Sequence, residues 1–161
     1  MTLVPQPLTL GMFVMPVHDP AKPMAQCFDE DLELACKCEA LGFADFWVGE
    51  HHSSAYENIV MPEIFLGKVL GLTESIRIGA APVCLQYHHP AHVAGRLAFL
   101  DHLSHGRLNV CFGPGAVATD MALHNADAVQ TSEERSQCLV AHLSKVVLCG
   151  RSIGPDRLGG G

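Results

Sequence analysis

The sequence predicts an α/β fold in which parallel strands form a sheet and helices pack against it. Short apolar runs alternate strictly with segments of helical spacing, which is typical of this fold class. The apolar runs are nearly continuous, as in strands that are buried on both faces. With 161 residues, 48% of them hydrophobic, the chain is long enough for one domain with a substantial core.

Four strand–helix units follow one another along the chain. The apolar runs predict strands at 8–14, 44–48, 76–84 and 108–112. Helical spacing predicts helices at 24–41, 62–72, 92–103 and 131–148, with a loop of small and polar residues before the last of them. Gly42 is expected to end the first helix, and Thr131 with Glu134 offers a capping box for the fourth.

The first predicted helix carries two acidic residues, Asp31 and Glu39, within its apolar face. Buried carboxylates need partners, and Arg96 or Arg107 are the candidates that the sequence offers.

Composition excludes several classes of function. The formal net charge of −7 leaves no basic surface for nucleic acid or an anionic membrane. Prolines and histidines interrupt the longest stretch without charged residues, so no membrane span is predicted. Seven cysteines without a CxxC pair, together with an N-terminus that has no positively charged signal, lead us to expect a cytoplasmic protein with reduced thiols.

Two architectures fit such a chain: an open doubly wound sheet and a (β/α)8 barrel. No G-x-G-x-x-G follows the first strand, where residues 11–19 read GMFVMPVHD, so the nucleotide-binding open sheet lacks its best signal. In either architecture, ligands bind at the carboxyl ends of the strands. The segments at those ends are EHH at 50–52, QYHHP at 86–90 and GPG at 113–115, which concentrates histidines at one rim of the sheet.

Three segments resemble the N-terminal half of the bacterial luciferase-like family of flavin-dependent monooxygenases. They are ALGFADFWVGEHHS at 40–53, TESIRIGAAPVCLQYHHP at 73–90 and LDHLSHGRLNVCFGPG at 100–115, in the family's order and spacing. The resemblance implies a (β/α)8 TIM barrel that binds reduced FMN, or a deazaflavin in some relatives, at its mouth. It also implies oxygenation of a small organic substrate by O2, a separate flavin reductase and a homo-oligomer.

The resemblance also implies individual roles. His51 matches the family histidine that acts in proton transfer beside the flavin, and a neutral imidazole can both donate and accept a proton. From spacing alone, a loop histidine that caps the strand end is the competing interpretation. Glu50 is expected at the cofactor site, where it would orient one of the imidazoles, and a plain carboxylate at the strand end is the competing interpretation. His52 is expected to point elsewhere and to make a structural hydrogen bond.

Two further segments match family features at the cofactor. Ala80, Ala81 and Pro82 match a strand bulge with a cis peptide under the flavin ring, and the X–Pro bond makes the cis form accessible. A proline that simply ends the strand is the competing interpretation. Gly113 and Gly115 would let the cofactor approach the backbone. Between them, Pro114 stands where relatives have an arginine that touches the cofactor, so that contact is not carried over.

A complete barrel takes about 250 residues, so the chain is expected to hold about the first four βα units of a truncated barrel. We expect residues 1–150 to form this partial domain and residues 151–161 to be a disordered or aberrant tail.

Three functions remain open. The first is a flavin-dependent monooxygenase that is impaired in this chain, and the second is a non-catalytic flavin-binding half-barrel. The third is a metal-dependent barrel hydrolase that uses His51, His89 and a carboxylate, although no H-x-H on the first strand supports it. No metal site is expected.

Overall fold

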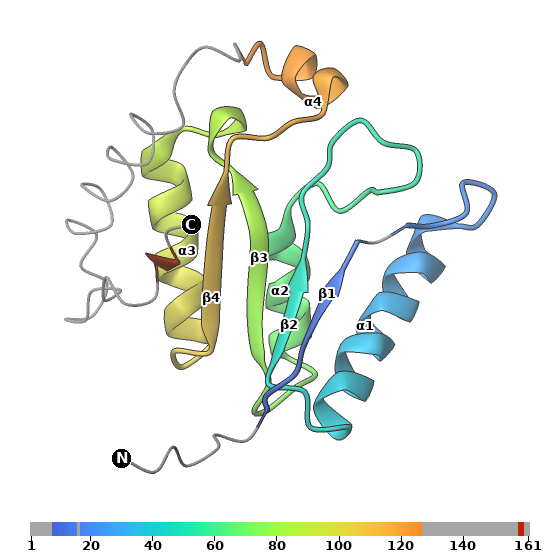
Figure 1. Ribbon diagram of the computed structural model, residues 1–161, viewed down its shortest axis with the longest axis vertical. Helices are drawn as coiled ribbons and strands as arrows, with labels where there is room; N and C mark the ends of the chain where they lie inside the picture. The colour runs from blue at the N-terminus through green and yellow to red at the C-terminus, as the bar shows by residue number, and fades with distance from the viewer. Residues whose placement is uncertain (1–7, 16, 127–157, 160–161) are drawn as a thin grey trace, which may run out of the picture.

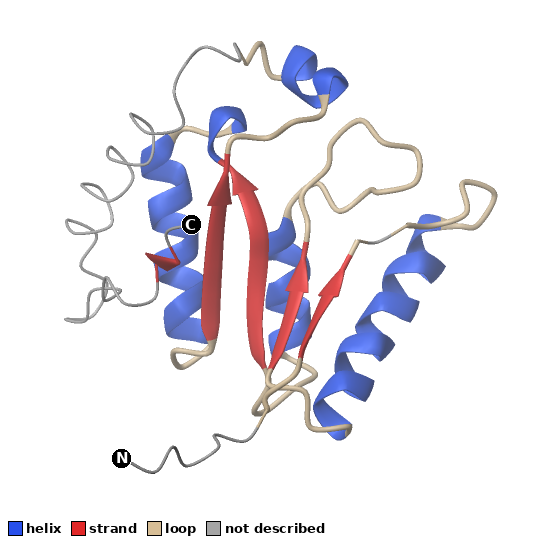
Figure 2. Cartoon of the chain, viewed as in Figure 1, coloured by secondary structure: helices blue, strands red, loops and turns tan. Residues whose placement is uncertain are grey.

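The computed structural model describes residues 8–15, 17–126 and 158–159 (Figures 1 and 2). Strands and helices alternate through most of this part of the chain. In order, the elements are β1 (Gly11–Val14), α1 (Met24–Ala40), β2 (Asp45–Val48), α2 (Pro62–Leu70), β3 (Arg77–Cys84), the 3-10 turn η1 (Leu85–Tyr87), α3 (Pro90–Leu103), β4 (Leu108–Gly113), α4 (Ala118–Leu123) and β5 (Leu158–Gly159).

The strand order distinguishes the two architectures. The sheet runs β1-β2-β3-β4-β5, and each strand pairs in parallel with the next. A doubly wound sheet reverses its order at a switch point, whereas a barrel adds each new strand at the same edge. The chain therefore forms an arc of a (β/α)8 barrel, and the open sheet is excluded.

The core lies between the sheet and the helices. Alternate residues of the strands, such as Phe46 and Val48 of β2, are fully buried and pack with Leu66 of α2 and Leu97 of α3. Figure 1 shows α2 and α3 behind the sheet and α1 beside β1. Among the described residues, no helix covers the middle of the opposite face, which we call the open face.

The described part of the structure contains the predicted strands and the first three predicted helices, with small differences at their ends. Gly42 follows α1 with a φ of 79°, as expected for a helix C-terminus. Helix α3 begins at Pro90, two residues before the predicted start, because proline suits the first helical position and His89 Nδ1 accepts from the backbone N–H of Ala91.

The prediction of an unbroken loop after β4 is wrong, because α4 forms there. The helix predicted at 131–148 lies outside the described residues. Of the tail predicted at 151–161, only Leu158 and Gly159 are described, and they pair with Val110 and Cys111 of β4. The domain boundary at residue 150 stays a prediction.

The expected partners of the two carboxylates on α1 are also wrong. Asp31 Oδ2 lies 3.0 Å from His18 Nε2. Glu39 instead accepts hydrogen bonds from the backbone N–H groups at the start of β3, including that of Ile76 at 2.8 Å. The sequence offers no signal for either contact, because the fold brings His18 to Asp31 and the backbone before β3 to Glu39.

None of the helices in the described ranges combines the length and the apolar character needed to cross a lipid bilayer.

Candidate functional site

Three segments converge at the carboxyl ends of the strands. They are the loop after β2 (residues 49–61), η1 with His88 after β3, and the segment from Pro114 through α4 after β4, all at the top of Figure 1. Their polar side chains form two groups, each built on one buried carboxylate.

His51 belongs to the first group, which we call the His51 group and which includes Ser53, Glu57 and Asp120. His51 Nδ1 lies 3.4 Å from Asp120 Oδ2, and Nε2 lies 3.8 Å from Glu57 Oε2. The His51 side chain keeps 18% of its surface exposed. The imidazole thus faces a buried carboxylate at Nδ1 and a more exposed one at Nε2, and part of its surface remains exposed to solvent.

Asp120, in the first turn of α4, organises this group. Its Oδ1 accepts from the backbone N–H groups of His52 and Ser53, at 3.1 and 2.6 Å, and from the Ser53 hydroxyl. Burial by itself raises the pKa of Asp120, but these hydrogen bonds outweigh burial and lower it below its ordinary value. Asp120 is therefore ionised at neutral pH and fixes the backbone beside His51.

Sequence reasoning missed Asp120 because it placed the residue in a loop. The available signal was the segment ATDMAL itself, in which an acidic residue falls in the first turn of a short helix.

The second group, which we call the Glu50 group, is closed. The Glu50 side chain is fully buried, and its Oε1 lies 2.7 Å from His52 Nε2 and 2.6 Å from His88 Nε2. Glu50 Oε2 accepts from the backbone N–H of Cys84 at 2.8 Å. Burial raises the pKa of Glu50, but the hydrogen bonds from His88, His52 and Cys84 outweigh it and lower the pKa. Glu50 therefore orients two imidazoles, and His52 makes the structural hydrogen bond expected of it.

Aromatic rings surround the Glu50 group. Tyr87 meets the His52 ring edge-on at 5.5 Å between centroids and stacks on His124 at 4.8 Å. Burial raises the pKa of both Tyr87 and Cys84 to about 12, so both stay protonated. Burial, followed by repulsion from His52 and His88, lowers the pKa of His124.

The bulge expected on β3 is present. The Ala81–Pro82 peptide is cis, and the register between β3 and β4 shifts between Ala80 and Val83. The bulge lies level with Gly49 of the neighbouring loop, whose position would bring a Cβ within 3.8 Å of the Ala81 carbonyl oxygen.

The two glycines of the GPG segment each have a packing reason of their own, and their expected contact with the cofactor stays a prediction. At Gly113, a Cβ would come within 2.7 Å of Pro82 Cβ. Gly115 has a φ of 72°, and a Cβ there would collide with the Tyr87 hydroxyl. Both glycines thus make room for side chains of the chain itself.

The open face of the sheet is layered. Its lowest layer is polar, with the Asn109 amide bonded to Asp45 and to Arg77. In the next layer the Trp47 ring lies over Gly79, with no room for a Cβ.

The uppermost layer of the open face is small and apolar, and we call it the shelf; it consists of Met15, Gly49 and Ala81, with Phe13 adjoining. Phe13 is 49% exposed and Met15 is 42% exposed. A Cβ at Gly49 would sit 3.6 Å from Met15 Sδ and 4.0 Å from Phe13 Cζ, so glycine leaves one methyl's space open there. The shelf is thus an exposed apolar surface whose residue Gly49 lies two positions before His51 in the sequence.

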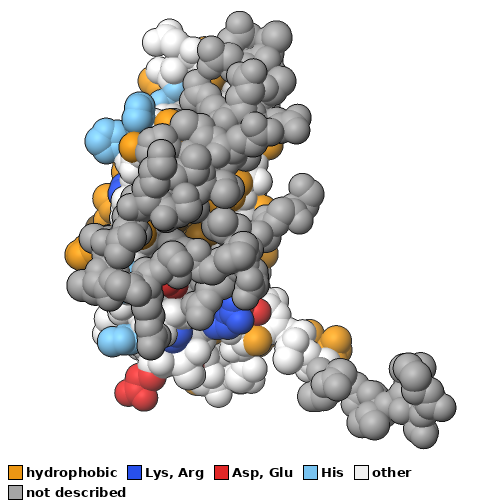
Figure 3. All heavy atoms as spheres, turned by 90° about the vertical axis from the view of Figure 1, so that its left-hand side faces the viewer, with side chains coloured by type: hydrophobic (Ala, Val, Ile, Leu, Met, Phe, Trp, Pro, Cys, Tyr) orange, Lys and Arg blue, Asp and Glu red, His pale blue; other side chains and the backbone are white. Residues whose placement is uncertain are grey.

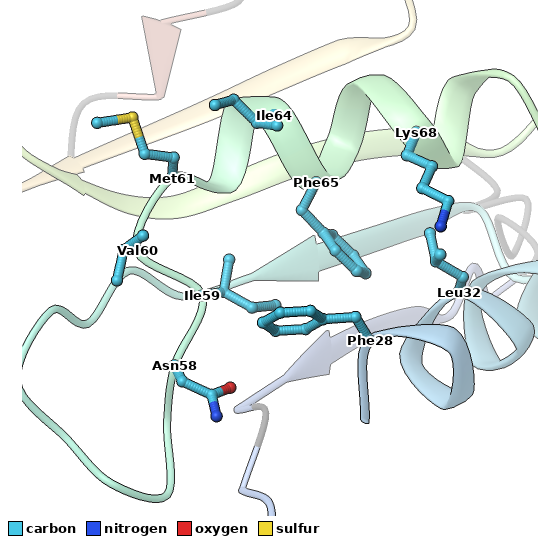
Figure 4. A pocket seen from close by; sticks show the side chains of 9 residues that line it. All are labelled: Phe28, Leu32, Asn58, Ile59, Val60, Met61, Ile64, Phe65 and Lys68. Atoms are coloured by element: carbon cyan, nitrogen blue, oxygen red, sulfur yellow. The ribbon is translucent and has the colours of Figure 1, made fainter. Parts of the chain in front are cut away.

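A separate apolar groove lies between α1 and α2 and has a cavity volume of about 340 Å³. Figure 4 shows Phe28 and Phe65 pointing into it from the two helices. Its lining touches the His51 group only through the loop after β2, because the Ile59 carbonyl accepts from the His51 backbone N–H. The groove is therefore not part of either carboxylate group.

The structure does not bring together the donors weighed for a hydrolase. His89 is exposed and its ring packs against His92, at 5.4 Å between centroids, whereas His51 turns toward Asp120. Within the described residues, the one set of three side chains that could hold a metal ion is Glu50, His52 and His88.

Comparisons with known proteins bear on the family and the fold of the chain. A family model described as luciferase-like monooxygenase matches residues 8–137. Limonene 1,2-monooxygenase of Rhodococcus erythropolis is 39% identical over 127 residues, which are 79% of this chain and 33% of that protein. The crystal structure of monooxygenase RslO1 from Streptomyces bottropensis has a TM-score of 0.76 at 30% identity and covers 84% of this chain and 41% of its own.

A third comparison shows the fold alone. The oxygenating constituent of 3,6-diketocamphane monooxygenase from Pseudomonas putida, solved in complex with FMN, has a TM-score of 0.77 at 23% identity. It covers 81% of this chain and 38% of that one. The chain spans about a third of the length of the curated relatives it matches.

Proposed function

The chain belongs to the luciferase-like monooxygenase family, and from that premise we propose that it forms the N-terminal part of a flavin-dependent monooxygenase. The reaction would use reduced FMN and O2 to oxygenate a small organic substrate. The observation that carries the proposal is His51, which is partly exposed, held by Asp120, and two residues along the chain from Gly49 of the apolar shelf. Because the chain spans about a third of its relatives, we propose that its own turnover is impaired.

His51 would be the catalytic residue. When bound, reduced FMN supplies the electrons that activate O2. An imidazole beside the flavin can donate a proton from one ring nitrogen and take one up again, which suits a reaction that moves protons near neutral pH. Asp120 would act as a positioning residue, because its carboxylate faces His51 Nδ1 and leaves Nε2 on the side of the more exposed Glu57.

The other residues expected at the cofactor would act through the bulge, through the backbone or indirectly. Ala80, Ala81 and Pro82 would support the flavin ring through the bulge at the shelf. Gly113 and Gly115 would contact the cofactor through the backbone, because Pro82 and Tyr87 occupy the space beside them. Glu50 would act on the site indirectly, since both of its oxygens already accept hydrogen bonds.

The proposed partners follow from the family. A separate flavin reductase would supply reduced FMN, in keeping with the solved relative that is itself called an oxygenating constituent. A deazaflavin is the alternative cofactor, and a homo-oligomer is the proposed assembly. The relative named for limonene suggests a small apolar cyclic substrate as the first probe.

The test combines binding with oxygen transfer. The chain would be titrated anaerobically with reduced FMN and, in parallel, with a reduced deazaflavin. It would then be supplied with limonene, 18O2 and reduced FMN from a separate NADH-dependent reductase, with products measured by mass spectrometry. We expect saturable FMN binding and a low yield of 18O-labelled product. His51→Ala should lower that yield at least a hundredfold, because loss of a general acid–base typically costs 10²–10⁴-fold.

His89→Ala is the matched control, because His89 is an exposed histidine at the same rim. It should leave both binding and product unchanged. Saturable FMN binding without labelled product would favour the non-catalytic flavin-binding module. Absence of flavin binding by the unmodified chain would overturn both functions.

A further inference from the structure

We propose that Glu50, His52 and His88 form a binding site for a divalent transition-metal ion of the Zn²⁺ class. One carboxylate oxygen and two imidazole nitrogens from these residues all lie within 4.8 Å of one another. They come from different segments, the loop after β2 and the turn after β3, so the fold and not sequence proximity assembles them.

The donor set favours a transition metal over Mg²⁺ or Ca²⁺. Two imidazoles and one carboxylate form a known zinc ligand set, whereas Mg²⁺ and Ca²⁺ prefer oxygen donors throughout. Acidic clusters at a surface are common without a metal, but here the Glu50 side chain is fully buried and each imidazole is only 8% exposed.

The three ligand atoms lie close to, but not at, the spacing that a bound tetrahedral ion requires. The two imidazole nitrogens now lie 2.7 and 2.6 Å from Glu50 Oε1. Ligand atoms around a tetrahedral ion with bonds of about 2.0–2.1 Å are about 3.3 Å apart. Metal binding would lengthen each imidazole–carboxylate separation by about 0.6–0.7 Å and would bring the two imidazole nitrogens, which lie within 4.8 Å of each other, to a similar spacing. Each ring would then carry its proton at Nδ1.

The surroundings meet two further requirements of a metal site. The backbone N–H of Cys84 donates to Glu50 Oε2 and fixes the carboxylate, as hydrogen bonds to metal-ligating carboxylates commonly do. The His124 ring lies 4.3 Å from the His52 ring, and His124 Nε2 is buried without a hydrogen-bond partner among the described residues. That nitrogen is available to a water molecule on the ion.

This site shares no ligand with the His51 group, since His51 faces Asp120, although the backbone N–H of His52 also bonds to Asp120. A bound ion would link the loop after β2 to the turn after β3. Because an ion that binds the folded chain stabilises it by mass action, metal binding and thermal stability are coupled.

The experiment uses the whole chain after removal of metal by a chelator. Titration with Co²⁺ should give the visible absorption bands of a four- or five-coordinate ion, saturating at one Co²⁺ per chain and displaced by Zn²⁺. Zn²⁺ at a hundredfold excess over its Kd should raise the thermal midpoint by about 5–10 °C. A wild-type chain that gives no saturable Co²⁺ bands and no Zn²⁺-dependent rise would overturn the proposal.

Variants locate the ion. His52→Gln and His88→Gln should each lower the Co²⁺ affinity at least tenfold. The control is the double variant His89→Gln/His92→Gln, which removes the exposed histidine pair at the start of α3. Figure 3 shows histidine side chains near the upper end of the face that includes α3, where a surface ion would bind. Unchanged affinity in the control supports the buried site, and loss of binding there would assign the ion to the surface instead.

Discussion

The His51 group and the Glu50 group both pair histidines with carboxylates at the same rim of the sheet. They differ in the distances between these side chains and in how far the side chains are buried. In the Glu50 group the nitrogen–oxygen distances are 2.6 and 2.7 Å, and the carboxylate is fully buried. In the His51 group the corresponding distances are 3.4 and 3.8 Å, and the imidazole is more than twice as exposed as His52 or His88. Neighbouring histidines therefore differ in packing: His52 and His88 lie close to one buried carboxylate, whereas the His51 ring has longer contacts and a larger exposed surface.

The difference between the two groups arises from the directions in which adjacent side chains leave the backbone. His51 and His52 are adjacent, and their side chains leave the backbone on different sides, so His52 turns to Glu50 while His51 turns to Asp120. Asp120 binds the backbone N–H of His52 as well, which joins the two groups through one peptide. The tightly bonded Glu50 group can therefore fix the position of the backbone that carries His51.

Removal of the Glu50 carboxylate should have the largest effect. Glu50→Ala leaves two buried imidazoles and the Cys84 N–H without their acceptor, and breaking a buried charged network of this kind costs about 3–5 kcal/mol. Asp120→Ala should cost less, about 1.5–3 kcal/mol, because its donors lie nearer the surface. Urea denaturation measures both values.

Glu33→Ala is the control for these two variants. Glu33 pairs with Lys37 on the exposed face of α1, and its loss should change the free energy of unfolding by no more than about 0.5 kcal/mol. If Glu50→Ala were no more destabilising than Asp120→Ala, the contrast between a closed and an open group would be lost.

The sequence predicted the sheet well because buried parallel strands are apolar runs, and β2 and β4 need no distant contact to be identified. It also predicted the cis bond at Pro82 and the structural bond of His52. The roles given to His51 and to the cofactor contacts stay predictions, since neither the fold nor the comparisons test them.

What the sequence did not predict depends on contacts between distant segments. His88 was assigned no partner, and its bond to Glu50 spans 38 positions. Asp120 lies 69 positions from His51, on a helix too short to show a hydrophobic period. Glu39 meets backbone amides, which leave no signature in side-chain chemistry.

A substitution at Gly115 tests how firmly Tyr87 is packed against the Glu50 group. An alanine there must adopt a φ of 72° and must also displace Tyr87, which packs on His52. Gly42 has a similar φ of 79° with nothing within 4 Å of its missing Cβ. Gly42→Ala should therefore cost about 1–2 kcal/mol for the backbone alone, and Gly115→Ala should cost more. Equal losses in urea denaturation would mean that Tyr87 moves freely and does not close the group.

The smallest effect concerns pH. Because the pKa of His124 is lowered in the folded chain, the unfolded chain binds its proton first as the pH falls. The neutral ring thus contributes stability above its ordinary pKa of about 6.5, and this contribution is lost as the pH falls through the lowered value. The lowered pKa values of Glu50 and Asp120 act in the same direction but at more acidic pH, below the ordinary carboxylate range.

The window between pH 7 and pH 5 therefore isolates the contribution of His124 from those of the two carboxylates. His124→Phe keeps a ring to stack on Tyr87 but cannot take up a proton, so its urea midpoint should fall less between these two pH values than that of the wild type. His92→Phe, which changes an exposed histidine, should leave the wild-type slope unchanged. An identical slope in His124→Phe would show that burial beside the Glu50 group does not keep this ring neutral.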